Sequence, residues 1–281
     1  MQKVLVTGGK GFIGAPLVNQ LKKRGYEVTV FDLPENDVTN LEQVRRAMVG
    51  IDTVFHLAGM LGTHELVVNS AKAVGVNIIG TLNILEAAKE VGAKVLFMSK
   101  PNCWLNTYTI TKVAAESFCE MYGKEFGVKY VILKPFNVLG EAQPMVDYRK
   151  AVPFMITESL QGKPLTIYGD GEQTVDLVYV GDVAEACILA GENEAAVGKI
   201  IEIGSGEEVT VNDMARLIIK LTGSNSTINH IPMRRGEVEH THIKADISAM
   251  RDLLVYIPHT SLEDSLKKTI EFYRKKLEGK V

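Results

Sequence analysis

The sequence is poor in the residues that mark several common classes of protein. Its three cysteines, Cys103, Cys119 and Cys187, are widely spaced and odd in number, which predicts reduced packing thiols rather than a disulfide framework. His240 and His242 alternate without a third ligand, so we expect no metal site. A formal net charge of -3 without a basic run argues against a nucleic-acid partner, and no apolar stretch is long enough to span a bilayer. Since no signal-peptide pattern is present, we expect a cytoplasmic protein with neither a nucleic-acid nor a membrane partner.

Short apolar segments are plentiful, by contrast, and they alternate with helical patterns. The chain has 281 residues, of which 46% are hydrophobic, enough for one large domain or two modest ones. Five apolar runs have strand character, and they lie at 3–7, 27–31, 53–57, 94–99 and 129–134. Long helical patterns follow the third and fourth of them, at 76–91 and 108–126. This alternation predicts an α/β fold with a doubly wound parallel sheet.

The first apolar run leads into a glycine-rich turn. Gly8, Gly11 and Gly14 are spaced three apart, and amphipathic helical spacing begins directly after them. Glycine suits such a turn because the backbone must bend tightly, let a pyrophosphate approach its N–H groups, and pack the new helix against the strand. The N-terminus of that helix attracts the phosphates. The glycines alone could equally form an ordinary strand-to-helix turn, but in this context they predict a dinucleotide site.

An acidic residue closes the second expected strand. Asp32 follows the run 27–31, about twenty residues beyond the glycine turn. A carboxylate in this position accepts hydrogen bonds from a ribose diol and repels a 2′-phosphate. Asp32 therefore favours NAD over NADP, although a solvated surface aspartate would look the same in the sequence.

Tyr108 and Lys112 place a phenol and an ammonium four residues apart, on one face of the expected helix 108–126. A tyrosine with a pKa near 10 is a poor base at neutral pH, but a nearby cation can lower that pKa by about one to three units. The same spacing is usually a surface pair. After a dinucleotide turn, it indicates an acid/base group.

Further motifs run in order along nearly the whole chain. They are TGGKGFIG at 7–14, HLAG at 56–59, NIIGT at 77–81, Tyr108 with Lys112 and Glu116, FNVLG at 136–140, GDGEQ at 169–173, DLVYVGDV at 176–183 and RRGE at 234–237. In these motifs the chain resembles the extended short-chain dehydrogenase/reductases, in particular the nucleotide-sugar epimerase/dehydratase family to which UDP-glucose 4-epimerases belong. The resemblance implies NAD as the cofactor and a nucleotide-diphosphate sugar as the substrate, with UDP-sugars favoured.

The resemblance also implies roles for individual residues. Tyr108 would be the acid/base, while Lys112 would bind the nicotinamide ribose and lower the tyrosine pKa. Asn137 would contact the substrate. Arg234 would bind the diphosphate of the substrate, since a guanidinium donates to two phosphate oxygens at once. The residues expected to bind NAD are Gly8, Gly11, Phe12, Ile13, Gly14, Asp32, Leu33, Asp37, Val38, Leu57, Ala58, Gly59, Tyr108, Lys112 and Phe136.

The sequence pattern changes near Ala151: the expected helices and strands become shorter, and turn-forming residues become more frequent. We expect residues 1–150, with about 174–204 returning to them, to form an NAD-binding Rossmann domain. Residues 151–281, mainly 151–173 and 205–281, would form a smaller α/β domain that binds the nucleotide sugar. A family-like homodimer, built from the helices near 76–91 and 108–126, is the expected assembly.

Three departures from the family pattern lie near the expected site. The family carries a catalytic hydroxyl after the fourth strand, but Pro101 stands in its place. The connection before the tyrosine is shortened to 102–107, and Val175 replaces a phosphate-binding arginine. We expect Ser99 to replace the hydroxyl, since it faces the same side of the strand as Pro101. Asn102 is the next candidate, and Thr107 and water are further alternatives.

Four functions remain open. Epimerisation at C4 fits best: Tyr108 would take the C4 hydroxyl proton, and NAD would take the hydride and return it to the other face of the keto sugar. A 4,6-dehydratase would need an Asp-Glu pair that is absent between Ser99 and Tyr108. Asp32 argues against an NADPH-dependent reductase. A non-catalytic NAD-binding sensor is supported by Pro101 but opposed by the retained Tyr108 and Lys112.

We predict that the protein binds NAD more tightly than NADP, because Asp32 would repel the added phosphate. Titration of the protein with each cofactor measures the two affinities directly. Binding of NADP as tight as that of NAD would refute the role given to Asp32.

Overall fold

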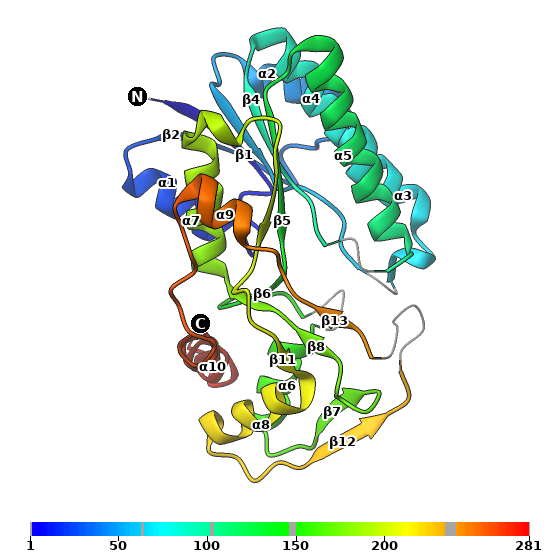
Figure 1. The fold of residues 1–281 in the computed structure, drawn as a ribbon, viewed down its shortest axis with the longest axis vertical. Helices are drawn as coiled ribbons and strands as arrows, with labels where there is room; N and C mark the ends of the chain where they lie inside the picture. Colours follow the sequence, from blue (N-terminus) through cyan, green and yellow to red (C-terminus); the bar gives the residue numbers. More distant parts are fainter. Residues whose placement is uncertain (1, 63–64, 102–103, 146–149, 234–239, 281) are drawn as a thin grey trace.

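A parallel sheet forms the centre of the amino-terminal part of the protein (Figure 1). The computed structural model describes residues 2–62, 65–101, 104–145, 150–233 and 240–280. Within them, this sheet has six strands in the order β10-β5-β4-β3-β1-β2, and all neighbours in it are parallel. The strands are β1 (Lys3–Thr7), β2 (Glu27–Phe31), β3 (Thr53–His56), β4 (Lys94–Met98), β5 (Tyr130–Pro135) and β10 (Ile200–Ile203). The predicted doubly wound α/β fold is confirmed.

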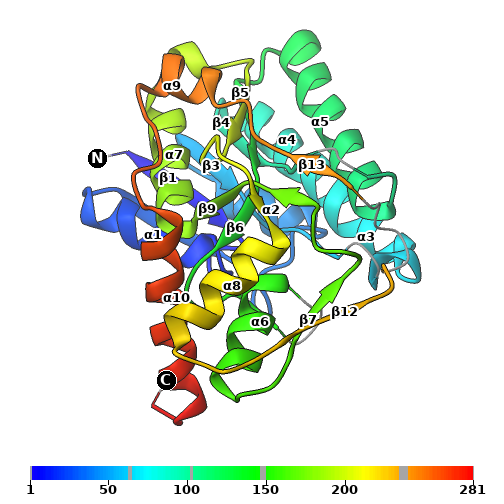
Figure 2. The same ribbon diagram turned by 60° about the horizontal axis from the view of Figure 1, so that its bottom comes forward.

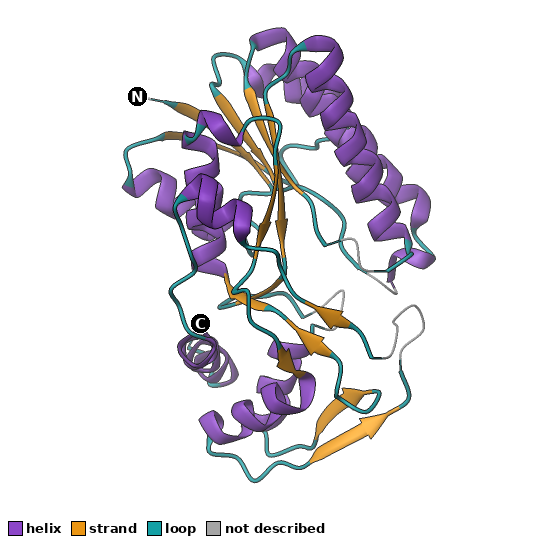
Figure 3. Cartoon of the chain, viewed as in Figure 1, coloured by secondary structure: helices purple, strands orange, loops and turns teal. Residues whose placement is uncertain are grey.

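Helices cover both faces of this sheet (Figure 3). One face carries α1 (Gly14–Lys23), α7 (Val180–Glu192) and α9 (Ser248–Leu254), and the other carries α2 (Leu41–Met48), α4 (Gly80–Val91) and α5 (Thr107–Phe126). The strands supply the two faces with alternate side chains: Val4 and Val6 pack toward α1 and α7, whereas Leu5 packs toward α2 and α4. Because both faces are buried, the strands read as continuous apolar runs. None of the helices in the described ranges is long and apolar enough to cross a membrane.

A second group of elements lies at the carboxyl ends of the strands (Figure 2). Its core is built by α6 (Ala151–Leu160), α8 (Val211–Thr222) and α10 (Leu262–Leu277), which bury side chains such as Ile156, Ile218 and Tyr273 together. Short strands complete the group: β7 (Leu165–Tyr168) pairs with β12 (Ile228–Ile231), β8 (Thr174–Val175) pairs with β11 (Val209–Thr210) and β13 (His242–Ile243), and β6 (Asn137–Leu139) pairs with β9 (Leu177–Tyr179).

Asp176 ties together the segments that pass between the two groups of elements. Its buried carboxylate accepts hydrogen bonds from Ser205 N and Oγ, both at 2.7 Å, from Gly206 N at 2.9 Å and from Ala245 N at 3.1 Å. Four donors offset the desolvation of the buried group. Asp176 thereby fixes the chain before β9 to the segments that follow β10 and β13. The domain boundaries given above stay predictions.

The helix expected at 76–91 has an irregular start. A helical run begins with α3 (Ser70–Val74), passes through a π-helical turn, η2 (Gly75–Ile79), and continues as α4. The wider turn carries Asn77, whose side chain points inward and is 1% exposed. Single π-turns of this kind often occur at functional sites. The sequence pattern located α4 but not the turn, because the turn depends on the partners that Asn77 finds elsewhere in the fold.

Candidate active site

The turn between β1 and α1 leaves no room for a Cβ atom at Gly8 or at Gly14. A Cβ atom at Gly14 would lie 2.1 Å from the Gly8 carbonyl oxygen, and one at Gly8, whose φ is +69°, would lie 2.8 Å from Ala58 N. Gly11 N donates to Gly8 O at 3.0 Å and closes the turn. Only glycine is accommodated at such distances. Bare backbone at the start of a helix is the setting in which a pyrophosphate binds, so the turn fits a dinucleotide.

Asp32 is held at the carboxyl end of β2 by two backbone N–H groups. Lys10 N donates to Oδ2 and Leu33 N donates to Oδ1, both at 2.8 Å. These bonds fix the carboxylate beside the glycine turn, and each oxygen keeps a lone pair for a ribose hydroxyl. The Lys10 ammonium is paired with Glu35 at 2.6 Å. The position of Asp32 fits the ribose diol of NAD.

Lys112 holds a buried ammonium group beside the end of β4. Its Nζ donates to Met98 O at 2.8 Å and lies 4.8 Å from the centre of the Phe97 ring. A Cβ atom at Gly59 would lie 3.2 Å from this Nζ, so the chain after β3 approaches as closely as glycine allows. Burial lowers the pKa of Lys112 from 10.5 to about 8. The side chain therefore keeps its charge at neutral pH.

Tyr108 lies one turn before Lys112, at the start of α5. Asn106 caps this helix by accepting a hydrogen bond from Thr109 N at 2.9 Å. The Tyr108 side chain is half-buried, and Lys100 Nζ lies 5.5 Å from the centre of its ring. The phenol thus stands on the same helix face as one cation and near a second, which is the electrostatic setting of a tyrosine acid/base.

Ser99 is buried next to the same helix face. Its hydroxyl donates to Glu116 Oε1, and Glu116 Oε2 forms an ion pair with Lys134 Nζ at 2.9 Å. Glu116 follows Lys112 by four residues, so the two side chains share one face of α5. The hydroxyl proton of Ser99 is directed to Glu116. The role expected for Ser99 as a donor to the substrate stays a prediction.

His56 lies in a chain of side-chain hydrogen bonds, close enough to Lys112 to be influenced by its charge. Thr7 Oγ1 and His56 Nδ1 are 2.7 Å apart, and His56 Nε2 and Thr81 Oγ1 are 3.1 Å apart. Burial, assisted by the charge of Lys112, lowers the pKa of His56 to about 3. The imidazole is therefore neutral, and it links the ends of β1 and β3 to the start of α4.

Asn77 joins three segments around the tyrosine, a role that the sequence did not reveal. Its Oδ1 accepts from Met60 N at 2.7 Å, and its Nδ2 donates to Met60 O and to Thr111 Oγ1, both at 3.0 Å. Thr111 donates in turn to the backbone oxygen of Tyr108 at 3.0 Å. A single amide inside the apolar stretch 76–79 was the available signal.

The segment after β5 leads from the sheet to the second group of elements. Phe136 is buried in a cluster with Ile243 and Ala245, whereas Asn137 is exposed and its Nδ2 donates to Asp176 O at 3.1 Å. Ligands of parallel α/β sheets bind at this edge. Phe136 and Asn137 therefore lie at this edge, and their contacts with cofactor and substrate stay predictions.

The remaining predicted site residues divide into two sets. Asn102 and Arg234 lie outside the described residues. Contacts of the others with NAD stay predictions, and these residues follow β1, β2 or β3 at the same edge: Phe12, Ile13, Leu33, Asp37, Val38, Leu57 and Ala58. In the part of the chain that is described, no group of three or more His, Cys, Asp or Glu side chains could hold a metal ion.

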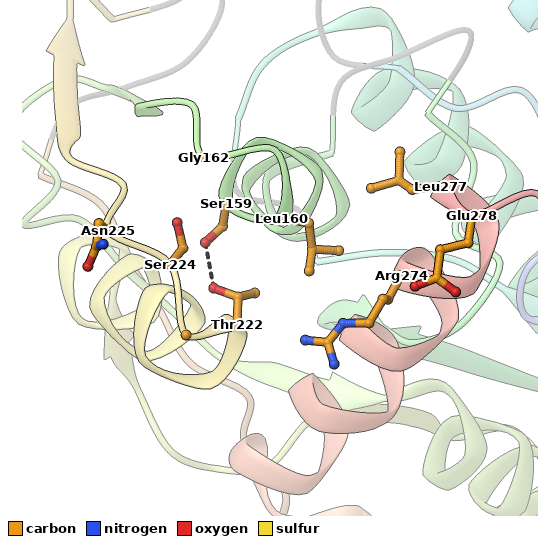
Figure 4. Close-up of a pocket in the computed structure, with 10 residues that line it drawn as sticks. Ser159, Leu160, Gly162, Thr222, Ser224, Asn225, Arg274, Leu277 and Glu278 are labelled. Carbon is orange, nitrogen blue, oxygen red and sulfur yellow. Dashed lines mark hydrogen bonds between the residues drawn. The ribbon is translucent and has the colours of Figure 1, made fainter.

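A polar hollow of about 620 Å³ lies elsewhere, between the ends of α6, α8 and α10 (Figure 4). Ser159 and Thr222 meet in its wall with hydroxyl oxygens 2.6 Å apart, and Arg274 and Glu278 line it from the side of α10. Its lining includes none of the residues at the strand ends. We assign it no part in the chemistry described here.

A glycine turn suited to a dinucleotide, next to a tyrosine and a buried lysine on one helix face, defines a dinucleotide-dependent enzyme of the short-chain dehydrogenase/reductase class. The model of the NAD dependent epimerase/dehydratase family matches residues 4–204. The chain belongs to this family, whose members include nucleotide-sugar epimerases and decarboxylases. Membership confirms NAD as the predicted cofactor.

Similar proteins cover nearly the whole chain. A UDP-N-acetyl-alpha-D-glucosaminuronate decarboxylase of Bacillus cytotoxicus is 31% identical, with 97% of this chain and 98% of that protein aligned. The crystal structure of a UDP-glucose 4-epimerase from Thermotoga maritima with UDP-glucose has a TM-score of 0.92 at 31% identity and covers 98% of this chain and 100% of that one. A UDP-glucuronic acid 4-epimerase from Bacillus cereus, in complex with UDP-glucuronic acid and NAD, has a TM-score of 0.90 at 29% identity, with the same coverage.

We predict that Lys112→Met stabilises the protein at pH 7, although it removes a residue of the site. The folded state holds the pKa of Lys112 at about 8, below its ordinary 10.5, so the buried charge destabilises the fold in full below pH 8. That cost fades as the pH rises from about 8 to 10.5. After allowance for the lost bond to Met98 O, the gain at pH 7 should be about 1 to 3 kcal/mol.

Urea unfolding of the parent and the variant at pH 7 and at pH 10 measures this gain and its pH dependence. Lys124→Met, an exposed position on the same helix, is the matched control and should change stability little. A loss of stability in Lys112→Met that is the same at both pH values would contradict the account of the buried charge.

Proposed function

We propose that the protein epimerises a UDP-sugar at C4, with Tyr108 as the acid/base. One observation carries the proposal: Tyr108 and Lys112 share a face of α5, and the Lys112 ammonium lies against Gly59 and the end of β4, at the same sheet edge as the glycine turn. The two solved 4-epimerases described above support it, since each resembles this chain along almost its whole length.

Each residue of the site would act on a particular group. Bound NAD supplies an acceptor, and later a donor, for the C4 hydride. Tyr108, as the phenolate, removes the C4 hydroxyl proton and returns it after the keto sugar has turned. Lys112 stabilises the phenolate and donates to the nicotinamide ribose. Asn137 and Arg234 hold the sugar nucleotide, Arg234 through its diphosphate.

Decarboxylation is the second candidate, because relatives with that activity in their names are 31% identical over almost the whole chain. Oxidation at C4 of a uronic acid gives a β-keto acid, which loses CO₂ readily, so the two reactions share their first step. They differ in the product: an epimer keeps the mass of the substrate, whereas a decarboxylated sugar is lighter by CO₂. A dehydratase or a reductase of the same family and a non-catalytic NAD-binding sensor stay as further alternatives.

We also propose that two copies of the chain associate through α4 and α5. These helices carry exposed apolar side chains on the outer surface of the protein, between 36% and 54% exposed: Val91, Ile110, Val113, Met121 and Phe126. An apolar face of this kind is favourably buried by a partner. Sedimentation velocity at micromolar concentration should give a dimer of the 30.8 kDa chain, and Ile110→Lys should shift it toward the monomer. A parent protein that sediments as a monomer would refute the proposal.

We predict that Tyr108→Phe removes nearly all turnover without unfolding the protein, since it deletes one oxygen and keeps the ring. The loss should fall roughly within the 10²- to 10⁴-fold range of acid/base assistance. Chromatographic separation followed by mass spectrometry, applied to reactions with NAD and either UDP-glucose or UDP-glucuronic acid, identifies the product, because separation resolves epimers that share one mass. Tyr26→Phe, whose hydroxyl bonds Glu192 at the surface, is the matched control and should keep full activity.

The outcomes separate the proposals. A product of the parent enzyme that separates from the substrate but has the same mass supports epimerisation, and a product lighter by CO₂ supports decarboxylation. Parent-like turnover in Tyr108→Phe would refute the role of Tyr108 as the acid/base, and a parent that is inactive on a broad panel of nucleotide sugars would favour the NAD-binding sensor.

A further inference from the structure

We propose that the ammonium group of Lys100 is a second cation of the active site, donating a hydrogen bond to the C4 oxygen of the sugar and stabilising the Tyr108 phenolate. This inference rests on the proposed function, in which Tyr108 is the acid/base. Lys100 would keep its own proton throughout, because the proton that leaves the C4 hydroxyl group goes to Tyr108. The lysine thus adds no new chemical step, but it supplies charge and a donor where the reacting oxygen lies.

The position of Lys100 is fixed by its neighbours. Its Nζ lies 5.5 Å from the centre of the Tyr108 ring and donates to Thr109 Oγ1 at 2.8 Å and to Pro101 O at 2.5 Å. Thr109 is buried in the first turn of α5, directly after Tyr108. These contacts fold the lysine side chain back onto the start of α5, so its charge stays beside the phenol instead of extending into solvent.

Other hydroxyl groups near the phenol already have partners. The Ser99 hydroxyl donates to Glu116 Oε1, and Thr107 Oγ1 lies 2.9 Å from Ser70 Oγ. Pro101 has no side-chain donor at all. An ammonium group on the same short segment can replace a hydroxyl as a donor, and its charge makes the bond to a developing oxyanion stronger.

The charges around Tyr108 sum in favour of a phenolate. Lys100 and Lys112 are close enough to influence each other, since the charge of Lys100 contributes, after burial, to the lowered pKa of Lys112. Glu116 and Lys134 neutralise one another in their ion pair, and His56 is uncharged at neutral pH. The charged residues on the elements packed against α5 are Glu65 on η1 (Glu65–Val67), Lys72 on α3, Glu86, Lys89 and Glu90 on α4, and Lys134 on β5.

The test compares Lys100→Met, which removes the charge but keeps the length, with Lys100→Arg, which keeps the charge. Lys163→Met, at an exposed position far along the chain, is the control. Each protein is assayed with NAD and with UDP-glucose or UDP-glucuronic acid, and kcat, KM and the pH profile of kcat/KM are recorded. NAD affinity is measured separately, because Lys100 should not contribute to it.

In Lys100→Met we expect kcat to fall by about 100- to 1000-fold, as for loss of one oxyanion donor. The acidic limb of the kcat/KM profile should move up by about one pH unit, since a cation near the phenol is lost. NAD affinity should stay unchanged. Lys100→Arg, which keeps the charge, should have a kcat and a pH profile close to those of the parent. A merely structural role for Lys100 would not move the pH profile.

A second measurement does not depend on turnover. The titration of Tyr108 is isolated as the difference in near-ultraviolet absorbance between the parent and Tyr108→Phe, and the same difference is taken in the Lys100→Met background. The midpoint should be higher by about one pH unit when Lys100 is replaced. Circular dichroism confirms that each variant is folded.

Two results would overturn the role of Lys100 while leaving the proposed function intact. In the first, Lys100→Met changes neither the pH profile of kcat/KM nor the midpoint of the Tyr108 titration, while Tyr108→Phe is inactive. The other is a loss of activity confined to UDP-glucuronic acid, which would mean that Lys100 grips the sugar carboxylate and not the C4 oxygen. If the parent turns over neither sugar, the titration of Tyr108 still tests the role of Lys100. A midpoint that rises in the Lys100→Met background supports a second cation beside Tyr108, and an unchanged midpoint refutes it.

Discussion

Burial of the Lys112 charge is the constraint on which the rest of the site depends. Moving an ammonium out of water costs several kcal/mol, and the protein can tolerate this only where other groups compensate. Here the compensation comes from Met98 O at the end of β4 and from the ring of Phe97. A Cβ atom at Gly59 would lie 3.2 Å from the ammonium nitrogen, so the chain that follows β3 has little room to approach α5 more closely. One side chain on α5 therefore contacts both the end of β4 and the chain that follows β3.

Glu116 and Lys134 extend this constraint by one turn of α5. Their side chains are only 8% and 11% exposed, so the ion pair is stable only if its remaining bonds are satisfied, and Ser99 supplies one of them. Glu116 also acts on its neighbour: its negative charge raises the pKa of Lys112 and opposes the larger effect of burial. Glu116 thus helps to keep the lysine charged at neutral pH, which the proposed chemistry requires.

The parts of this structure that the sequence predicted are those set by local backbone geometry. The glycine turn was predictable because a Cβ at Gly14 would collide with the Gly8 carbonyl, whatever the rest of the chain does. The partners of polar side chains were not predictable in this way. Ser99 was expected to face the substrate from strand alternation alone, yet its hydroxyl finds Glu116, seventeen positions further along the chain. Asn77 likewise depends on Met60, which no periodicity brings next to it.

The connection between β4 and α5 is described at both of its ends. Residues 102 and 103 lie outside the described part of the chain. Trp104 nevertheless packs against the cluster of Phe136, Ile243 and Ala245, which includes residues from both groups of elements. At the other end of the segment, Lys100 folds back onto the start of α5. The described ends of the connection thus contribute two side chains, one to the cluster of Phe136 and one to the surroundings of Tyr108.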